Sequence, residues 1–428
     1  MVVGASCSRA PTSHSPATRE LEAPATTTIA PITQLLFTNR RIIAKSNCMI
    51  QRPFWIQKIE QAWQRAPIVW LTGVRRVGKT TLTQHWKGDA VFFNCDLPRN
   101  RKLLEDPEAV FQQIDQKIVI LDEIHQTENP SEILKIAADE FPHLRILATG
   151  SSTLSATKKF KDSLTGRKRV VHLCPVLATE LAAFGISRLE DRLLRGGLPD
   201  CLLSSGPDPE FYSEWLDSFF ARDVQELFQV DKRSEFLKLC QLLLRQSGEL
   251  ASQTTLSKHT GLSRPSVVKY LDMLETTHFI HILRPYHGGG RRELLAQPKI
   301  YGFDTGFIAH FRSWQSLRPA DCGGLLEHLV LDLLRAYFPT QPIHFWRDKQ
   351  QREIDFVLAR PDGTLTAIEC KWSRSNFDTR NLDAFRAAYP NGKNLIVTAA
   401  PGDPFETKVG THAVQICQLD KLIDALSI

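Results

Sequence analysis

The sequence lacks the features that would place it in a special class of protein. It has no run of about 18 apolar residues, which argues against a membrane-spanning helix. Its charge is not one-sided, because 53 Lys and Arg face 47 Asp and Glu and leave a formal charge of +6. This mild basic excess permits a nucleic-acid partner without requiring one. With 42% hydrophobic and 23% charged residues, the composition is that of a soluble globular protein.

The cysteines form no pattern typical of a metal site or a disulfide framework. Nine cysteines are scattered without a C-x-x-C pair or a Cys/His cluster at zinc spacing. An odd, unpatterned set is typical of a reducing compartment, in which cysteines serve as small buried apolar residues. We therefore expect a cytoplasmic protein without structural zinc.

The 428 residues are enough for two to four domains. Residues 1–48 are rich in Ala, Ser, Thr and Pro and poor in acids, so we expect them to be disordered. Their composition is similar to that of a transit peptide, but we favour Met49 as the true start of the chain. Three folded units are expected after that: an α/β core over 49–178, a largely helical region over 179–300 and an α/β domain over 301–428.

Apolar strands alternate with helical stretches in the first folded unit. Strands are expected at residues 68–72, 91–94, 117–122 and 145–149. This alternation predicts a parallel sheet with right-handed crossover connections. Further on, strands are expected at residues 356–358, 366–370 and 395–397, with a helix over 325–337 ahead of them.

A phosphate-binding loop follows the first strand directly. Residues 73–80 read Gly-Val-Arg-Arg-Val-Gly-Lys-Thr, which is the G-x4-G-K-[ST] pattern. The glycines let main-chain N–H groups curl around a β-phosphate, Lys79 neutralises β/γ oxygens and the Thr80 hydroxyl ligates Mg²⁺. The N-terminus of the following helix adds partial positive charge. The pattern predicts ATP and Mg²⁺ as cofactors, bound by Gly73, Val74, Arg75, Arg76, Val77, Gly78, Lys79, Thr80, Thr81 and Asp122.

Two acids follow the third predicted strand. The apolar run 117–121 delivers Asp122 and Glu123 to the end of that strand. Asp122 is expected to hold Mg²⁺ through water, and Glu123 to orient and activate the attacking water. The spacing to the phosphate loop makes this pair the expected second half of an ATPase site.

Nine short segments, in order along the chain, resemble one protein family, the prokaryotic AAA-type ATPases that carry a C-terminal nuclease-like domain of unknown function. The resemblance runs from about Phe54 to the C-terminus and implies a P-loop ATPase core of the cytoplasm. One departure is Gly302, where a large apolar or aromatic residue is expected. The segments are Gly73–Thr80, Leu121–His125, Ala148–Ser152, Leu164–Arg167, Gly196–Pro199, Arg222–Val224, Lys299–Gly306, Gly324–Glu327 and Glu353–Phe356.

The resemblance implies two further catalytic residues. The strand over 145–149 resembles the one whose tip places a polar group near the γ-phosphate, and Ser151 is our candidate, with Thr149 and Ser152 left open. A helix N-cap is the alternative for Ser151. Arg167 resembles an arginine finger that acts on the nucleotide of a neighbouring subunit, which would imply a homo-oligomer. The alternative is a solvated basic turn formed by Arg167, Lys168 and Arg169.

The middle region contains a predicted helix-turn-helix. Residues 256–274 read as two short helices, with Gly261 in the turn and Ser263 capping the second helix. A winged hairpin is expected after Phe279. DNA contact is one interpretation, and packing against protein is the other. The candidate DNA contacts are Arg264, Ser266, Lys269, Arg291 and Arg292.

The last unit is similar to the PD-D/E-x-K nucleases. A hairpin over residues 353–371 would bring Asp355 and Glu369 together, and Lys371 would share the face of Glu369. In such nucleases the acids bind Mg²⁺, the lysine orients water and a helix carries a further acid, which would be Glu327 here. The alternative is a vestigial fold whose acids pair with Lys371, Arg347 or Arg352.

The fold class expected is therefore α/β: a P-loop core, a helical winged-helix region and a nuclease-like α/β domain. The function expected is ATP hydrolysis by an AAA-type, DNA-associated protein, with Glu123, Lys79, Arg167 and Ser151 as catalytic residues. One alternative is a Mg²⁺-dependent endonuclease gated by ATP. Another is a non-hydrolysing switch that recruits a protein partner.

Overall fold

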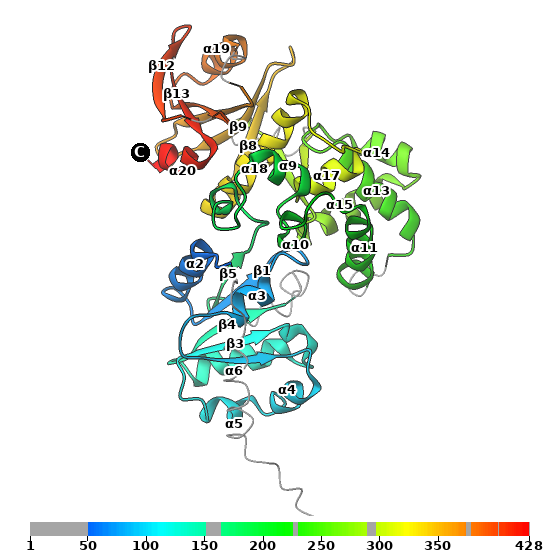
Figure 1. Cartoon of the computed structure of the whole chain (residues 1–428), viewed down its shortest axis with the longest axis vertical. Coiled ribbons are helices and arrows are strands. Elements are labelled where there is room, and N and C mark those ends of the chain that lie inside the picture. Colours follow the sequence, from blue (N-terminus) through cyan, green and yellow to red (C-terminus); the bar gives the residue numbers. More distant parts are fainter. Residues whose placement is uncertain are drawn as a thin grey trace, which may run out of the picture.

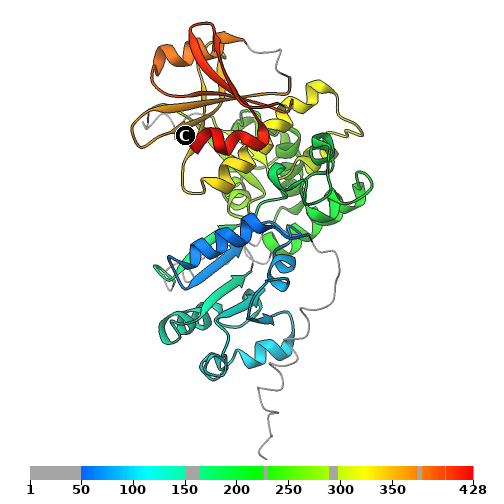
Figure 2. The same cartoon turned by 60° about the vertical axis from the view of Figure 1, so that its left-hand side comes forward.

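The structure is a computed structural model that describes residues 50–150, 164–225, 230–288, 297–373, 378–400 and 402–427. In Figure 1 one sheet lies at the lower end of the molecule and a second at the upper end, with helices between them and to one side. Figure 2 shows the same separation of the two sheets after a turn of 60°. The predictions for residues 1–48 lie outside the described residues. In the described part of the chain, no helix is long and apolar enough to cross a membrane.

The first sheet has five parallel strands in the order β2-β3-β4-β1-β5. Strand β1, which lies between β4 and β5, is buried at every position, as expected when helices cover both faces of a parallel sheet. The four predicted strands are confirmed, and β5 shows that Lys168 and Arg169 lie in a strand rather than in a solvated turn. The strands are β1 (Ile68–Thr72), β2 (Ala90–Asn94), β3 (Ile118–Asp122), β4 (Arg145–Thr149) and β5 (Lys168–His172).

Helices and short turns flank this sheet. Four of the helices begin at a proline, which suits a first helical position because its N–H would have no partner there. One face of the sheet packs on α4–α6 in a core of its own. The other face joins the core of the middle region. The elements are α2 (Pro53–Trp63), α3 (Lys79–Gln84), α4 (Pro98–Leu103), α5 (Pro107–Gln112), η2 (Ile124–Gln126), α6 (Pro130–Glu140) and η3 (Ala178–Glu180).

The middle region is helical, as predicted. Its core contains an aromatic stack in which the Trp215 ring lies 5.3 Å from Phe219, 4.9 Å from Phe303 and 4.8 Å from Phe307. This stack joins segments far apart in the sequence into one unit. The elements are α9 (Leu189–Arg195), α10 (Pro199–Leu202), α11 (Pro209–Phe219), the π-helical turn η4 (Phe220–Gln225), α13 (Arg233–Arg245), α14 (Gln253–Thr260), α15 (Arg264–Thr276) and α17 (Thr305–Phe311).

The second sheet has eight strands in the order β12-β13-β11-β10-β9-β8-β6-β7. The predicted boundary at residue 300 falls within β7, so the middle region and the C-terminal domain share this sheet. The predicted strands and the helix over 325–337 are confirmed. The elements are β6 (Ile280–Pro285), β7 (Lys299–Gly302), α18 (Pro319–Tyr337), β8 (Ile343–Arg347), β9 (Glu353–Ala359), β10 (Leu365–Lys371), α19 (Thr379–Ala388), β11 (Asn394–Thr398), β12 (Phe405–Val409), β13 (His412–Gln418), η5 (Leu419–Lys421) and α20 (Leu422–Ser427).

Packing explains the unexpected Gly302. A Cβ at this position would lie 2.7 Å from Cδ2 of Leu244, so a side chain does not fit unless the leucine moves. The N–H of Gly302 donates a 2.7 Å hydrogen bond to Oγ of Ser247. At the end of β7, α13 therefore occupies the space in which we expected a large side chain.

Candidate functional site

The loop between β1 and α3 has the curled backbone that its glycines permit. Gly73 has a φ of 150° and Gly78 a φ of 97°, values that side chains disfavour. A Cβ on Gly73 would lie 2.5 Å from the carbonyl oxygen of Leu173. Between the glycines, Arg76 has a φ of 59°, which non-glycine residues rarely adopt. The loop thus turns tightly just before the N-terminus of α3.

Lys79 begins α3 and folds back over this loop. Its Nζ donates hydrogen bonds to the carbonyl oxygens of Gly73 (2.9 Å) and Val74 (3.2 Å). Burial lowers the pKa of Lys79, and the nearby carboxylates of Glu123 and Asp223 only partly oppose this. The ammonium is therefore held by main-chain carbonyls, which are neutral partners.

Asp122 ends β3 beside the start of α3. Its Oδ1 accepts a 2.7 Å hydrogen bond from Oγ1 of Thr149 and a longer one, 3.4 Å, from Oγ1 of Thr80. Burial raises the pKa of Asp122, and the hydrogen bonds from Thr149 and Thr80 act against that effect. A carboxylate and a hydroxyl from two different elements thus face each other, and both are oxygen donors of the kind that Mg²⁺ prefers.

Glu123 is held in a left-handed conformation, with a φ of 53°. Its main-chain N–H donates to Oγ1 of Thr149 (2.9 Å), and its Oε2 lies 3.1 Å from Nδ1 of His125. Burial acts to raise the pKa of Glu123, but His125 and Lys79 outweigh it and the pKa is lowered. The carboxylate is therefore ionised at neutral pH, as a base that activates water must be.

Thr149 and His125 make contacts with the two acids that the sequence did not predict. One hydroxyl, that of Thr149, fixes both acids at once from the tip of β4. The sequence analysis named Thr149 only as an alternative to Ser151 for the polar group near the γ-phosphate. Ser151 and Ser152 themselves lie outside the described residues. His125 stood in a family-like segment without a role, and its contact with Glu123 could not be inferred from spacing.

Lys79, Thr80, Glu123 and His125 line a cleft of about 640 Å³, whereas Asp122 and Thr149 are buried. Its other wall comes from the middle region, which sequence reasoning did not foresee. Pro199 and Asp200 approach from the start of α10, and Arg222 and Asp223 from the π-helical turn η4. The family-like segments that contain Pro199 and Arg222 were the only signal in the sequence.

The middle region also holds the phosphate loop directly. Nε of Arg75 lies 3.1 Å from Oδ2 of Asp223, a residue 148 positions further on. The carbonyl oxygen of Arg75 accepts a 3.0 Å hydrogen bond from Nε1 of Trp215. The guanidinium of Arg76 lies 5.0 Å from the ring centroid of Phe211, within range of a cation–π contact. The two arginines of the loop thus join it to α11 and η4.

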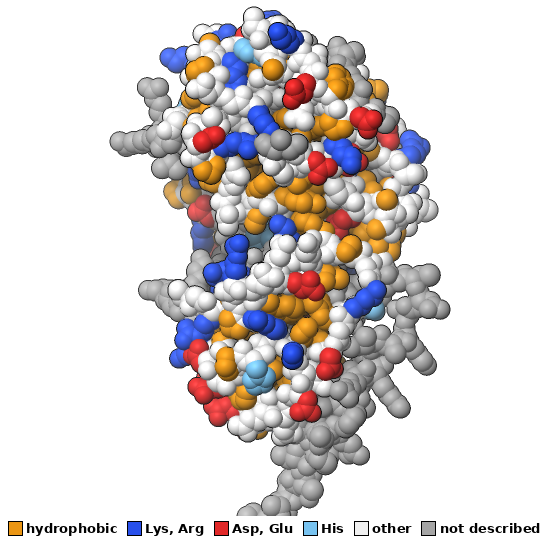
Figure 3. Space-filling view, turned by 90° about the vertical axis from the view of Figure 1, so that its left-hand side faces the viewer, with side chains coloured by type: hydrophobic (Ala, Val, Ile, Leu, Met, Phe, Trp, Pro, Cys, Tyr) orange, Lys and Arg blue, Asp and Glu red, His pale blue; other side chains and the backbone are white. Residues whose placement is uncertain are grey.

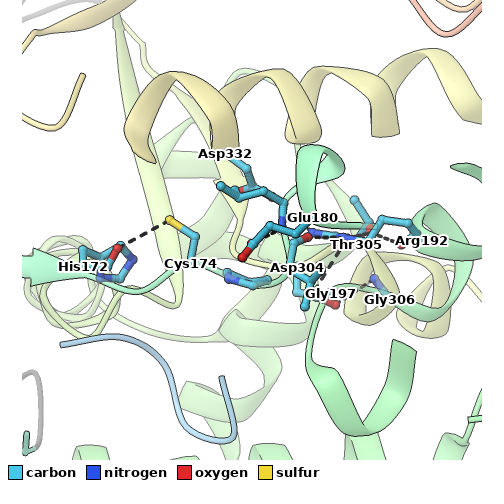
Figure 4. Close-up of polar contacts among 12 residues, drawn as sticks. His172, Cys174, Glu180, Arg192, Gly197, Asp304, Thr305, Gly306 and Asp332 are labelled. Atoms are coloured by element: carbon cyan, nitrogen blue, oxygen red, sulfur yellow. Dashed lines mark hydrogen bonds and ion pairs between the residues drawn. The ribbon is translucent and has the colours of Figure 1, made fainter. Parts of the chain in front are cut away.

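The segment Gly196–Asp200 runs from this cleft to a buried ionic network (Figure 4). The N–H of Gly197 donates a 2.6 Å hydrogen bond to Oδ2 of Asp304, at the N-terminus of α17. Its carbonyl oxygen accepts one from the N–H of Val176 (2.7 Å). A side chain at Gly196 would collide with the Asp304 carboxylate, so this contact requires glycine.

Arg192 lies at the centre of the network and is fully buried. It donates to Oγ1 of Thr305 (2.8 Å) and to Oδ2 of Asp332 (3.3 Å), and its Nη1 is 4.0 Å from Asp304. Burial raises the pKa of Asp332 to about 7, and the charge of Arg192 opposes that rise. Figure 4 shows Asp332 reaching the arginine from α18. Helices α9, α17 and α18 therefore meet at one guanidinium.

Arg167 lies away from the phosphate loop of its own chain. It precedes β5, so it is at the opposite edge of the sheet from the strand ends that carry Asp122 and Thr149. Its Nε and Nη2 donate to the carboxylate of Asp139 at 2.6 and 3.0 Å. Within one chain it lies at the wrong end of the sheet to reach the phosphate loop, so any catalytic role must act on another subunit.

The two helices predicted around Gly261 are confirmed as α14 and α15. Gly261 has a φ of 78° after α14, and Oγ of Ser263 accepts a hydrogen bond from the N–H of Ser266 to begin α15. Arg264 and Lys269 are exposed and Ser266 is partly exposed, as expected. The strand pair β6–β7 follows, while Arg291 and Arg292 lie outside the described residues. Figure 3 shows the face that lies on the left in Figure 1, where positive and negative side chains are interspersed.

The predicted hairpin of the last unit is confirmed as β9 and β10. These strands pair antiparallel up to Phe356 and Ile368, so Asp355 and Glu369 are the next residues on the two strands. Asp355 accepts a 2.7 Å hydrogen bond from the N–H of Cys370, and Nζ of Lys371 donates to Oε2 of Glu369 at 2.8 Å. The two acids and the lysine are close, as the sequence predicted.

A second lysine, Lys299 of β7, lies among the other acids of this cluster. Its Nζ forms an ion pair with Glu353 and lies 3.9 Å from Oε2 of Glu327. Glu327 also accepts a 2.8 Å hydrogen bond from the hydroxyl of Tyr301. Burial raises the pKa of Glu327 to about 8, and Asp355 adds to the rise. Glu327 is thus engaged within the protein.

A divalent metal does not fit these acids as they stand. In the part of the chain that the structure describes, no group of three or more His, Cys, Asp and Glu residues is arranged to hold a metal ion. The metal ligands predicted at Glu327, Asp355 and Glu369 each have a protein partner instead. Of the cations expected in the alternative interpretation, Lys371 pairs with Glu369, while Arg347 pairs with Glu353 and Arg352 with Asp348.

Three family models match successive parts of the chain. Residues 65–182 match the model described as "AAA domain", and these residues contain β1, β3 and the phosphate loop. This part of the chain is an AAA-type ATPase domain. Residues 186–318 and 322–419 match two models described as domains of unknown function, DUF8612 and DUF4143. The AAA domain therefore ends just before the cleft wall formed by the middle region.

Relatives align over most of the chain. An uncharacterized protein of Mycobacterium tuberculosis is 27% identical over 386 residues, which cover 85% of this chain and 87% of the relative. One from Haemophilus influenzae is 24% identical over 389 residues, covering 82% and 94%. Among solved structures, the Walker-type ATPase PABY2304 of Pyrococcus abyssi is 16% identical with a TM-score of 0.40, covering 62% of this chain and 96% of that one.

Proposed function

We propose that the AAA domain binds Mg²⁺-ATP in the cleft and hydrolyses it. The observation that carries this proposal is the convergence of Lys79, Thr80 and Glu123 on one cleft that begins at a curled phosphate loop, with the buried Asp122 accepting a hydrogen bond from Thr80. The carbonyl partners of Lys79 are neutral, so its ammonium can exchange them for the charged oxygens of a β/γ-phosphate.

The oxygen donors at the tip of β3 fit a magnesium ion. Thr80 and Asp122 supply a hydroxyl and a carboxylate on the phosphate side of the cleft, and Mg²⁺ bound with the nucleotide would neutralise charge on the phosphates. Glu123, ionised and oriented by His125 and Thr149, accepts the proton of the attacking water. Arg222 brings a further positive charge from the middle region to the same cleft.

Two measurements on the full chain test the proposal. Labelled ATP should bind the wild type and Glu123→Gln but not Lys79→Ala, since only the last variant loses a phosphate contact. Phosphate release should fall about 10²- to 10⁴-fold in Glu123→Gln, the usual contribution of a general base. Glu128→Gln, an exposed acid nearby, is the matched control and should keep the wild-type rate. Equal release by Glu123→Gln would contradict the assignment of Glu123.

We infer further that the nucleotide state is coupled to the C-terminal region. Support comes from the segment Gly196–Asp200, which borders the cleft at one end and bonds Asp304 at the other. Any shift of Pro199 or Asp200 on nucleotide binding would be passed to α17 and α18 through Arg192. Hydrogen exchange in α17 and α18 should therefore differ between ATP-bound and free protein. In Asp304→Asn that difference should shrink while ATP affinity is retained.

We also propose DNA as a ligand of the α14–α15 unit, through phosphates rather than bases. The exposed Arg264 and Lys269 support this, because recognition helices contact DNA near their N-terminal end. Filter binding should show an affinity for DNA that falls with salt. Arg291/Arg292→Ala should lower the slope of log affinity against log salt concentration by about two units. An unchanged slope would remove those two residues from the interface.

A non-hydrolysing switch is the competing proposal. Tight ATP binding with near-zero turnover and no DNA shift would favour recruitment of a protein partner instead. Arg167 offers a separate test of oligomer formation, because a finger acts only between subunits. Mixing Arg167→Ala with Glu123→Gln should then restore part of the hydrolysis that each variant has lost.

A further inference from the structure

The C-terminal acid cluster contains a cation of its own at the place where β7, α18 and β9 meet. The ammonium of Lys299 contacts Glu353 of β9 and approaches Glu327 of α18. Its side chain is only 5% exposed, so the charge lies inside the protein. A lysine is rarely buried to this extent unless it is paired.

Each acid around it already accepts a hydrogen bond or ion pair from a protein group. Glu353 also accepts a 2.9 Å hydrogen bond from Arg347, and Glu327 accepts one from Tyr301. Asp355 accepts the N–H of Cys370. One oxygen of Glu369 is bound by Lys371, while its buried Oε1 has no hydrogen-bond partner among the described residues. At least one oxygen of every acid is thus taken by a protein donor, which leaves few oxygens for a metal ion, a centre that needs several oxygen ligands.

Formal charges show what Lys299 contributes. With every group counted as ionised, four carboxylates, those of residues 327, 353, 355 and 369, face three cations, those of residues 299, 347 and 371. One negative charge remains. Without Lys299 two would remain, which is the charge that a divalent cation neutralises.

We propose that the Lys299 ammonium takes the place of a divalent metal ion in this cluster, so that the C-terminal region works without a metal. The cluster then joins β7, which continues into the middle region, to α18 and β9 by ion pairs. It is a fixed structural connection and not a phosphodiester-cleaving site. This inference is independent of ATP hydrolysis in the cleft.

Manganese binding by the nucleotide-free full chain tests the proposal. Every protein in this experiment carries Asp122→Asn, so that the ATPase site does not contribute, and the chain with this substitution alone is called the parent. The concentration of unbound Mn²⁺ is measured by electron paramagnetic resonance. The parent and Lys299→Arg should show no Mn²⁺ site in the micromolar range. Lys299→Gln should gain one such site per chain, and adding Asp355→Asn should abolish it.

Thermal unfolding covers the case in which Lys299→Gln is unstable. Micromolar Mn²⁺ should raise the melting midpoint of Lys299→Gln by several degrees but leave Lys299→Arg unchanged, because binding to the folded state alone stabilises it. The proposal is overturned if the parent binds one Mn²⁺ that Asp355→Asn removes, or if folded Lys299→Gln gains no Mn²⁺ affinity. It is also overturned if the wild type nicks plasmid DNA with Mn²⁺ and Asp355→Ala does not.

Discussion

Two groups of acids in this molecule each lie beside a lysine, the half-buried Lys79 and the buried Lys299, and the two lysines are held in opposite ways. Among the described residues, Lys79 donates only to carbonyl oxygens of its own loop, and burial lowers its pKa. Lys299 is paired with carboxylates. Burial acts to lower the pKa of Lys299 as well, but Glu327, Asp355 and Glu353 outweigh it and raise the pKa. We therefore propose a ligand site at Lys79, whose partners are neutral and which lines an open cleft, and none at Lys299.

The strongest test compares the effects of replacing each lysine by methionine. Lys299→Met should lower the free energy of unfolding by about 3–5 kcal/mol, because it leaves buried carboxylates without their counter-charge. Lys79→Met should change it by less than about 1 kcal/mol, since only neutral carbonyls lose a partner, while nucleotide binding is lost. Guanidinium denaturation and ATP binding, measured on both variants, decide between these outcomes. Similar destabilisation by both would break the comparison.

A second test concerns the segment that connects the two ends. Gly196 has a φ of 84° and Gly166 a φ of 78°, so alanine at either position costs about 1–2 kcal/mol in backbone strain. Only at Gly196 would the new Cβ also collide with Asp304, since no described atom lies within 4 Å at Gly166. Gly196→Ala should therefore be about 1–3 kcal/mol more destabilising than Gly166→Ala. Equal midpoints in denaturant would show that the contact with Asp304 is dispensable.

A third test asks whether the cleft depends on positioning by Thr149. Thr149→Val removes the donor to Asp122 and the acceptor of the Glu123 N–H, and hydrogen bonds to charged groups are worth about 1.5–3 kcal/mol. The rate of phosphate release should fall about 10- to 100-fold with ATP affinity nearly unchanged. Thr127→Val is the control, because its buried hydroxyl donates to the carbonyl oxygen of Ile124 and not to either acid. It should lower stability without lowering the rate.

The smallest expected effect is a pH dependence at the junction of the two regions. The rings of His172 and His278 lie 3.9 Å apart, with His281, Arg335 and Lys79 as further positive or protonatable groups. Burial lowers the pKa of His278 to about 3, and Arg335 adds to this.

Because the folded-state pKa of His278 lies below the unfolded value of about 6.5, its contribution to stability is complete above pH 6.5. It is lost as the pH falls from there toward 3. His278→Asn, which suits the φ of 60° at this residue, should reduce the fall in melting midpoint between pH 7 and pH 5 by a few degrees. A pH profile identical to that of the wild type would exclude His278 from the effect.

Much of the AAA domain could be predicted because its signals are local. The phosphate loop is eight consecutive residues, and each apolar strand is a short run that ends in the residue of interest. Parallel strands place their carboxyl ends at one edge of a sheet, so the order of the strands along the chain is enough to expect Asp122 near Thr80. The hairpin of Asp355 and Glu369 followed from the same kind of local pattern.

The other wall of the cleft could not be predicted, for a physical reason. Arg222 and Asp223 reach it only because Trp215 and its aromatic neighbours pack α11 and η4 against the phosphate loop. Such packing depends on residues far apart in the sequence. Strands β8, β12 and β13 were missed as well, because each is a short run in which polar residues interrupt the apolar ones.

The sequence alone indicated a P-loop core and the residues that we propose to bind phosphate, because those residues are neighbours in the chain. Only the tertiary structure decided what the second set of acids does. Lys299 is contributed by a different strand from Glu353 and by a different element from Glu327, and ion pairs of this kind form only when the sheet and α18 come together. The order of charged residues along a chain gives the members of such a cluster but not their partners.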